Sequence, residues 1–563
     1  MTLQFYSEDI AHEEIHFVNA KSATGTFLRW CSKRSRNCSH VVYVHKLDFD
    51  LVEFLFSAYE MLVGVGGSFE LRAGDWRITG CYGTPTFCSL SDGKGRTIQL
   101  IDSFSFFRGS LDKAAKLFCP DLPKYKRPKL LGEKLFRSSD TAFTEYAMRD
   151  AVIAYHIGKS IEAMHREFDI RQAVSVADMA AVIFRHKFLT YVIPQTSRDI
   201  IDASLLSYHG GKNNVTVDRG WYTGISSIDI SSAYNGSMRE LPAFSDVELY
   251  RRVRFGKGRI PKRVNPWGVY CVSGTVAPCS WPSVFSHAFK PLHGTVGDIW
   301  MQGIELNEAL DSDELKLTSI SGYCYDADKD NQAPGLRNFV DTFYERKENA
   351  ADPVQRYMYK TIGNSVYGKF IQTRKRGTHA YTDVDAEVTV NAADLVAGGM
   401  FHPFIASAIT AGPRARIHRL EHHYSAIHTA TDGIFTAASV RRARSESERD
   451  LFPTKHTQIG DLTVEAENAK LLLLRNKCYV LYVDEAGKKT IPSKVYKGLH
   501  IRKEARHGFQ GSVTELEKMV KTGRRDYTIN RPRKLKEAVK AGLRPNEFVK
   551  KKMTLRVGAI GGK

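Results

Sequence analysis

Two aspartates far apart in the chain lie in β-prone segments. In SSIDISSAYNGSM, Asp229 stands between Ile228 and Ile230, so strand alternation turns the isoleucines to one face and the carboxylate to the other. In AIHTATDGIFTAA, Asp432 and Gly433 form an Asp-Gly pair between two β-prone runs, which predicts a hairpin turn. Two such carboxylates can share a pair of divalent cations for phosphoryl transfer. Taken alone, each segment is explained more simply as a strand-end aspartate or an ordinary turn.

A third segment, KTIGNSVYGKF, predicts a helix with one polar face. Lys360, Asn364 and Tyr367 are spaced i, i+4 and i+7, and Gly368 suits the helix end. A structural helix would place apolar residues on such a stripe, whereas these side chains suit the triphosphate, sugar and base of a nucleotide. Lys347 in FVDTFYERKENA adds a second cation, although a solvated lysine is the commoner explanation for it.

The composition is that of a folded protein with several domains and an anionic partner. The 563 residues are 42% apolar, and 81 Lys and Arg against 62 Asp and Glu give a net charge of +19. Such an excess attracts nucleic acid, with a generic basic surface as the alternative. The nine cysteines include no closely spaced pair, so we expect reduced thiols in the cytoplasm. The polar start and the lack of a long apolar run predict neither a signal peptide nor a membrane helix.

The elements that must position these residues fall into three stretches. Residues 1 to about 190 mix strand-like runs such as HVVYVHKLDFDL with helical ones such as TEYAMRDAVIAYHIGKSIEAMH, an α/β pattern. The run YHGGKNN around Tyr208 predicts a linker. From about 220 to 480, β-like segments separated by insertions predict a sheet assembled from distant parts. The basic stretch after about residue 490 is expected to lie against nucleic acid or to be a solvated face.

Together these segments resemble the family B DNA polymerases, with DISSAY as motif A, KTIGNSVYG as motif B and TATDG as motif C. YHGG and LRNKCYVLY narrow the resemblance to the protein-primed polymerases of small bacteriophages and linear plasmids. It implies an α/β and α+β multidomain fold, with an RNase H-like exonuclease domain before a right-hand palm, fingers and thumb. The implied ranges are 1–195 exonuclease-like, 196–254 linker and first palm segment, 255–325 palm insertion like terminal-protein region 1, 326–370 fingers, 371–400 insertion like terminal-protein region 2, 401–489 palm and 490–563 thumb.

The resemblance implies template-directed addition of dNTPs to the 3′-hydroxyl of a DNA primer-template, with a terminal priming protein as a further partner. The enzyme would be a monomer in the cytoplasm, that of the host cell if a phage encodes it, and would copy a phage or mobile-element genome by strand displacement. Two Mg²⁺ ions, for which Mn²⁺ can substitute, would be held by catalytic Asp229 and Asp432 and by the carbonyl of Ile230. The implied nucleotide contacts are Tyr234, which would exclude a 2′-hydroxyl, Lys347, Lys360, Asn364 and Tyr367. The implied DNA contacts are Tyr208, Gly210, Gly211, Lys477 and Tyr479.

The exonuclease motifs are incomplete. FYSEDIA, VHKLDFDLVEF and EYAMRD occupy the places of the three motifs and supply Asp9, Asp50, Tyr146 and Asp150. The family has Asp-x-Glu in the first motif, but here Ala11 follows Asp9, and Lys46 replaces the usual Asn of the second. We therefore expect a weak or absent 3′–5′ exonuclease, unless a neighbouring glutamate substitutes.

Motif C departs as well, because Ala430 and Gly433 stand where the family has Asp and Ser. A related motif occurs in the primer-independent polymerases of pipolin elements, so primer-independent synthesis is one alternative. A catalytically impaired nucleic-acid-binding protein is another. A remote third is a zinc metallopeptidase, because the run from His12 to His16 fits HExxH, which on a helix would place two histidines on one zinc.

Overall fold

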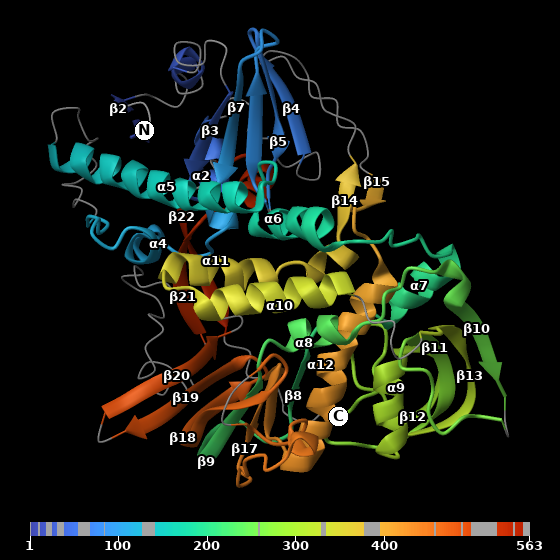
Figure 1. Ribbon diagram of the computed structural model, residues 1–563. Helices are drawn as coiled ribbons and strands as arrows, with labels where there is room; N and C mark the ends of the chain where they lie inside the picture. Colours follow the sequence, from blue (N-terminus) through green and yellow to red (C-terminus); the bar gives the residue numbers. More distant parts are fainter. Residues whose placement is uncertain are drawn as a thin grey trace.

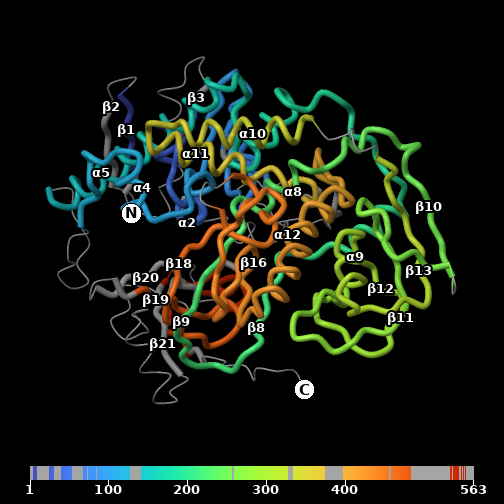
Figure 2. Tube along the Cα trace, turned by 60° about the horizontal axis from the view of Figure 1, so that its bottom comes forward, coloured from blue at the N-terminus to red at the C-terminus, as the bar shows by residue number. Residues whose placement is uncertain are grey.

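The computed structural model shows two tiers of sheet with helices between them (Figure 1). The residues it describes are 2–8, 12–17, 25–30, 39–54, 68–83, 85–126, 141–256, 259–327, 334–376, 394–454, 458–485, 488–496, 526–543 and 547–554. The upper tier holds the N-terminal sheet and the lower tier holds the sheet that carries Asp229. Helices α10 (Pro334–Asn349) and α11 (Pro353–Gly363) lie side by side between the tiers in Figures 1 and 2.

The N-terminal unit is built on a five-stranded sheet in the order β3-β7-β6-β5-β4, in which β3 and β7 are parallel and the other pairs antiparallel. Helix α5 (Thr141–Phe168) confirms the predicted helical stretch, and its buried face includes Ile153, Ile157 and Ile161, spaced by one turn. The remaining elements of this unit are β3 (Ser39–Val44), α2 (Leu47–Phe54), β4 (Ser68–Ala73), β5 (Trp76–Cys81), β6 (Phe87–Ser91), β7 (Thr97–Asp102), η1 (Ser103–Ser105), α4 (Leu111–Phe118), α6 (Val176–Ile183) and the π-helical turn η2 (Phe184–Phe188).

The strand-like run HVVYVHKLDFDL is only partly a strand, because β3 ends at Val44 and Asp50 lies on helix α2. The HExxH segment lacks the helix that the metallopeptidase alternative requires: β2 (His12–Phe17) pairs with β1 (Thr2–Ser7) in an antiparallel hairpin. Residues four apart on a strand are about 13 Å apart, too far for two histidines to share one zinc ion. The backbone therefore argues against the metallopeptidase alternative.

The lower sheet has seven antiparallel strands in the order β20-β19-β18-β9-β17-β16-β8. It confirms the expectation of a sheet assembled from distant segments, since β9 lies between strands that come more than two hundred residues later. As the sequence predicts, Ile228 and Ile230 are buried on one face, in a cluster with Ile417 and Leu420. The strands are β8 (Lys212–Val215), β9 (Gly220–Ile230), β16 (His428–Thr431), β17 (Gly433–Thr436), β18 (Leu462–Arg475), β19 (Cys478–Glu485) and β20 (Lys488–Tyr496).

Helices α8 (Ala233–Glu240) and α12 (Pro403–Tyr424) pack together beside this sheet (Figure 1). Most residues of α12 are buried along its whole length, which makes it the central helix of the lower tier. The two helices touch at Gly412, where any Cβ would lie 2.1 Å from the Oγ of Ser237. Helix α7 (Arg198–Ser207) leads from the N-terminal unit into the linker.

Residues 250–325 form a separate four-stranded sheet, in the order β10-β13-β11-β12, at the right of Figure 1. Its elements are β10 (Tyr250–Phe255), β11 (Gly268–Val276), β12 (Gly294–Gln302), α9 (Gly303–Asp311) and β13 (Leu315–Tyr325). The other elements are η3 (Val247–Leu249), η4 (Tyr367–Ile371), η5 (Glu446–Glu448), α14 (Leu535–Ala541) and the hairpins β14 (Thr373–Arg376) with β15 (Asp394–Ala397) and β21 (Asp526–Pro532) with β22 (Phe548–Thr554). No helix in the described ranges is long and apolar enough to cross a membrane.

Two buried ion pairs tie α12 to the start of the lower sheet and to α9. Lys212 and Glu421 pair with side chains 2% and 0% exposed, and Thr429 also donates to Glu421 at 2.5 Å. Arg414 donates two 2.7 Å hydrogen bonds to Glu305. Buried charges of this kind are tolerated only when paired, so each pair fixes the register of the elements it joins.

Replacing Lys212 by Met should lower the free energy of unfolding by about 3–5 kcal/mol, because Glu421 would remain charged and buried. Denaturant unfolding measures this loss. The double variant Lys212→Met with Glu421→Gln should recover most of it. Arg198→Ala breaks only the exposed pair with Asp202 and should cost about 0.5 kcal/mol or less. A Lys212→Met protein as stable as wild type would show that this pair does not hold the sheet to α12.

Candidate active site

Asp229 and Asp432 meet at the centre of the lower sheet. Asp229 is the next-to-last residue of β9 and lies opposite Gly433 of β17. Asp432 occupies the turn between β16 and β17, where its carbonyl accepts a 2.8 Å hydrogen bond from the N–H of Ile230. The hairpin predicted from Asp-Gly is confirmed, and its tip lies against the strand that carries the first aspartate.

Burial and neighbouring carboxylates both disfavour the charged form of this pair. Burial, helped by the charges of Asp432 and Glu465, raises the pKa of Asp229 to about 8. Burial also raises the pKa of Asp432, with Glu465 adding to the rise while Lys477 opposes it. A carboxylate surrounded by negative charge takes up either a proton or a cation.

Glu465 was not found by the sequence reasoning. It is exposed on β18, at a point where the pairing of β18 with β9 shifts register between Val464 and Ala466. A bulge of this kind turns a side chain away from the face that simple alternation predicts. The only signal in the sequence is the acidic run VEAE, which does not reveal the bulge.

The donor set suits a hard divalent cation bound jointly with substrate. No group of three His, Cys, Asp or Glu side chains in the described ranges is arranged to hold a metal ion by itself. Mg²⁺ is commonly held by one or two carboxylates, with waters and substrate phosphates completing its shell. Asp229 and Asp432 provide such carboxylates.

The two departures from motif C fit their surroundings. A Cβ at Gly433 would lie 2.8 Å from the Oδ1 of Asp229, so glycine leaves room for that carboxylate. Ala430 packs against an apolar cluster that includes Ile225 and Phe435. An aspartate at position 430 would carry its charge into that cluster, which explains why alanine is tolerated there.

The YHGG segment lies against the turn that holds Asp432. A Cβ at Gly211 would come within 2.3 Å of the Cγ2 of Thr431 and 3.1 Å of the Tyr234 hydroxyl. Arg414 donates hydrogen bonds to the carbonyls of His209 and Gly210, the second at 3.0 Å. Arg414 on α12 thus holds the predicted linker on one side, and Gly211 contacts Thr431 of motif C on the other. Tyr208 is the residue at which helix α7 ends.

Motif A and motif B meet through two tyrosines and two asparagines. The rings of Tyr234 and Tyr367 stack with centroids 4.6 Å apart and planes 9° apart. The Nδ2 of Asn235 donates to the Oδ1 of Asn364 at 2.8 Å. The structure therefore brings three of the predicted nucleotide contacts to one place, next to Asp432, whose charge contributes to a raised pKa of Tyr367.

The predicted motif B helix is shorter than expected. Helix α11 ends at Gly363, Asn364 caps it, and Tyr367 and Gly368 fall in the 3-10 turn η4. Gly363 approaches α10 closely, since a Cβ would lie 3.1 Å from that of Phe343, and glycine followed by Asn and Ser favours a helix end. Lys360, Asn364 and Tyr367 thus do not share the one continuous helical face that their spacing predicts.

The two predicted lysines of this region differ. Lys360 is exposed on the last turn of α11 and forms no ion pair with another described residue. Lys347 is largely buried, pairs with Glu348 at 2.6 Å and lies 4.2 Å from the centre of the Tyr344 ring. Lys360 is therefore the more available cation.

Lys477 and Tyr479 also differ from each other. Lys477 lies in the turn between β18 and β19, near enough to Asp432 to oppose the rise in its pKa. Tyr479 is only 4% exposed and packs edge-on against Phe435 and His428. The tyrosine thus belongs to the core behind the site, and the lysine to the site itself.

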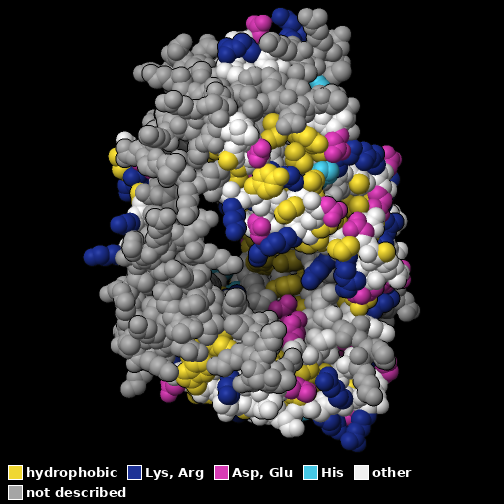
Figure 3. Space-filling model, turned by 90° about the vertical axis from the view of Figure 1, so that its left-hand side faces the viewer, with side chains coloured by type: hydrophobic (Ala, Val, Ile, Leu, Met, Phe, Trp, Pro, Cys, Tyr) yellow, Lys and Arg dark blue, Asp and Glu magenta, His cyan; other side chains and the backbone are white. Residues whose placement is uncertain are grey.

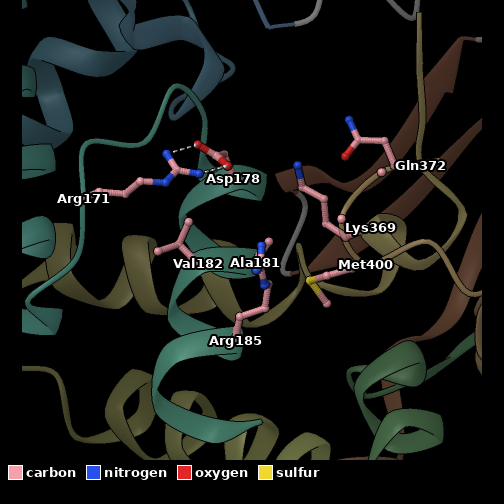
Figure 4. A pocket seen from close by; sticks show the side chains of 10 residues that line it. Arg171, Asp178, Ala181, Val182, Arg185, Lys369, Gln372 and Met400 are labelled. Carbon is pink, nitrogen blue, oxygen red and sulfur yellow. Dashed lines mark hydrogen bonds and ion pairs between the residues drawn. The ribbon is translucent and has the colours of Figure 1, made fainter. Parts of the chain in front are cut away.

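A second feature is a basic pocket of about 330 Å³ between α6 and the loop before α12 (Figure 4). Arg171 is paired with Asp178 through two hydrogen bonds of 3.1 and 3.2 Å. Arg185 and Lys369 pair with no carboxylate of the described chain, and burial lowers the pKa of Lys369. The pocket can receive a phosphate, and Lys369 lies two residues beyond Tyr367.

The left-hand face of the molecule is hollowed at mid-height, and among the described side chains at the edge of this hollow are both Lys or Arg and Asp or Glu (Figure 3).

Three of the four exonuclease-like residues, Asp50, Tyr146 and Asp150, fall in the described part of the chain. Asp9 and Ala11 lie outside the described residues. Asp150 on α5 pairs with Lys124, which also lies 4.7 Å from the centre of the Tyr146 ring. Asp50 is exposed on α2. The ammonium of Lys124 thus lies beside the Asp150 carboxylate, where a metal cation would otherwise bind.

Three comparisons with known proteins add to this geometry. Residues 290–399 match the family described as DNA polymerase type B, organellar and viral, a segment that includes motif B. No curated protein matches the sequence. The fold is similar to that of phi29 DNA polymerase, at 16% identity: its complex with primer-template DNA has a TM-score of 0.65 over 97% of this chain and 94% of that one, and its orthorhombic crystal form has 0.65 over 98% and 95%.

The complex of phi29 DNA polymerase with single-stranded DNA gives a TM-score of 0.66 at the same identity, covering 97% of this chain and 94% of that one. The multidomain α/β and α+β architecture and the resemblance to family B polymerases, both expected from the sequence, are confirmed. All seven described cysteines are free thiols, as expected.

The raised pKa of Asp229 predicts how stability depends on pH without metal. Its folded-state pKa, about 8, lies above the unfolded value, so folding favours the protonated form and stability falls as pH rises from about 4 to 8. Asp229→Asn should therefore raise the melting temperature at pH 8 in EDTA by roughly 2 °C or more, and change it little at pH 4. Scanning calorimetry of both proteins at the two pH values measures this difference. Equal shifts at both pH values would contradict the raised pKa.

Proposed function

We propose that this chain, which carries a type B polymerase segment on the fold of phi29 DNA polymerase, is a DNA-directed DNA polymerase that adds deoxynucleotides to a 3′-hydroxyl. The observation that carries the proposal is the meeting of Asp229 and Asp432 at adjacent strands, beside the stacked Tyr234 and Tyr367. The fold alone does not assign a reaction, but paired carboxylates next to an aromatic platform, with Lys477 near Asp432, suit phosphoryl transfer from a nucleoside triphosphate.

Some residues of the site would bind the metal ions, and others would contact the triphosphate and the primer. Asp229, Asp432 and the carbonyl of Ile230 would hold two Mg²⁺ ions. When bound, these ions lower the pKa of the primer hydroxyl and neutralise charge on the phosphates. Lys360 and Lys477 would meet the triphosphate and the primer terminus, and Lys347, which pairs with Glu348, would add a third cation there.

Tyr234 and Tyr367 form the floor of the nucleotide site. The ring of Tyr234, held by stacking on Tyr367, would lie beneath the sugar of a bound nucleotide, where it would exclude a 2′-hydroxyl and select deoxynucleotides. Asn364, held by Asn235, faces the new base pair. Tyr479, like Lys477, is implied as a DNA contact, and because it is buried it would act there by supporting the Lys477 turn.

The DNA path follows the basic surfaces. The Tyr208–Gly211 linker contacts the primer end, and the pocket lined by Arg185 and Lys369 receives phosphates of the template strand before it reaches Tyr367. Residues 255–325 and 371–400 act as the two insertions that hold a priming protein and surround DNA during strand displacement. The separate sheet of residues 250–325 supports the first of these assignments. The free thiols fit the cytoplasm of the cell that carries the genome.

Replacing either catalytic aspartate by alanine should lower nucleotide incorporation by at least about 1,000-fold, because each removes a cation ligand worth several kcal/mol. Extension of a labelled primer on its template measures this, and the same DNA measures affinity, which should change little. The matched control is Glu467→Ala, an exposed carboxylate on β18 two residues from Glu465. Extension by Asp229→Ala or Asp432→Ala at a tenth of the wild-type rate would refute the proposal. Synthesis on the template without primer would favour the primer-independent alternative.

The exonuclease should be weak, because Lys124 pairs with Asp150 and position 11 carries no carboxylate. Labelled single-stranded DNA with Mg²⁺ and no nucleotides should be degraded slowly. Ala11→Glu should raise the rate by about 100-fold, the usual effect of restoring one charge-stabilising group. Rapid degradation by the unaltered chain, lost in Asp150→Ala, would show that another carboxylate already fills the gap.

A further inference from the structure

One guanidinium on α12 holds two loops together behind the catalytic strand. Arg416, with a side chain 15% exposed, donates through Nε to the carbonyl of Asp450 at 3.3 Å and through Nη2 to that of Arg449 at 3.0 Å. Its Nη1 donates to the carbonyl of Gly460. Three carbonyls from two loops thus converge on one side chain, an arrangement that the planar fork of arginine allows and the single ammonium of lysine does not.

The Gly460 turn in turn fixes the end of motif A. The N–H of Gly460 donates to the carbonyl of Ser231 at 2.7 Å, and the N–H of Ser231 donates to the carbonyl of Asp461 at 2.8 Å. Ser231 follows Asp229 by two residues. Gly460 has φ +86, a conformation that favours glycine, so the turn has little freedom to adopt another shape.

The same turn starts the strand that carries Glu465. Leu462 pairs with Ile230, Thr463 pairs with Asp229, and the register shift that contains Glu465 follows at once. The Asp461 carboxylate stiffens the turn by accepting from the N–H of Gln458 at 2.9 Å and from the hydroxyl of Thr454 at 3.2 Å. A displacement of the turn therefore moves Asp229 together with the neighbouring Glu465.

We propose that Arg416 is a positioning residue that sets the spacing of Asp229, Asp432 and Glu465 through the Gly460 turn, and thereby the affinity of the site for divalent cations. The inference rests on the proposed polymerase function. Cation sites tolerate displacements of only about 0.5 Å, and loss of a residue that orients the ligands typically weakens metal affinity by about 10–100-fold. Arg416 touches neither substrate nor cation itself.

The test is a titration of the full chain with Mn²⁺, in which the electron paramagnetic resonance signal of the free ion measures how much Mn²⁺ is bound. Arg416→Lys keeps the charge but cannot reach three carbonyls, so its Mn²⁺ dissociation constant should rise by about tenfold or more. The matched control is Arg419→Lys on the same helix, whose partners are the side chains of Glu308 and Asp450, and it should stay within about twofold of wild type. The Mg²⁺ concentration that gives half-maximal primer extension should likewise rise in Arg416→Lys and change little in Arg419→Lys.

A purely structural role would lower the melting temperature of Arg416→Lys and leave its Mn²⁺ affinity unchanged, and that result would overturn the inference. If Arg416→Lys does not fold, Gly460→Ala decides. Gly460 has φ +86, a conformation that residues with a Cβ rarely adopt, so alanine there strains the turn without removing Arg416. Weaker Mn²⁺ binding by this variant supports the inference, and unchanged binding rejects it.

The two levels of the account fail separately. If the wild-type chain does not extend a primer, the polymerase proposal fails, while the Mn²⁺ comparison still judges Arg416. If the wild-type chain extends primers and Arg416→Lys binds Mn²⁺ as tightly as the wild-type chain, only the positioning role of Arg416 is refuted.

Discussion

The burial of two neighbouring carboxylates, one near the end of β9 and one in the turn beside it, is the constraint on which the rest of the lower tier depends. Asp229 and Asp432 are held close to each other and near Glu465, in surroundings buried enough to raise the pKa of both aspartates. Left alone, such a cluster would take up protons or move apart. The fold holds it together with backbone hydrogen bonds from Ile230 and Ser231, which cannot be given up without opening the sheet.

The charges needed to hold this arrangement lie away from the site, on α12. Arg414, Arg416 and Glu421 project from one helix toward the linker, the Gly460 turn and the first strand, and each is largely buried. Buried ion pairs are weak sources of net stability, but removing one partner is costly, so they specify one arrangement over others. Helix α12 thus acts as the fixed frame against which motifs A and C and the linker are set.

The sequence was sufficient wherever a local pattern decides the structure. Alternation around Asp229 and the Asp-Gly pair at 432 define a strand and a hairpin by themselves, and both are confirmed. It was insufficient where tertiary contacts decide. The bulge in β18 brings Glu465 toward the aspartates, and close packing against Phe343 requires glycine at position 363, where helix α11 ends. Arg416 lies in the run RARIHRL, where nothing distinguishes it from a solvated basic face.

The most direct test of the central claim is a crystal structure of the chain with Mn²⁺, primer-template DNA and a non-hydrolysable deoxynucleoside triphosphate, using anomalous scattering to locate the cations. The account predicts two Mn²⁺ peaks about 3.5–4 Å apart between Asp229 and Asp432, with the triphosphate bound to at least one of them. Anomalous peaks found only elsewhere, or a nucleotide bound away from the Tyr234 ring, would contradict it.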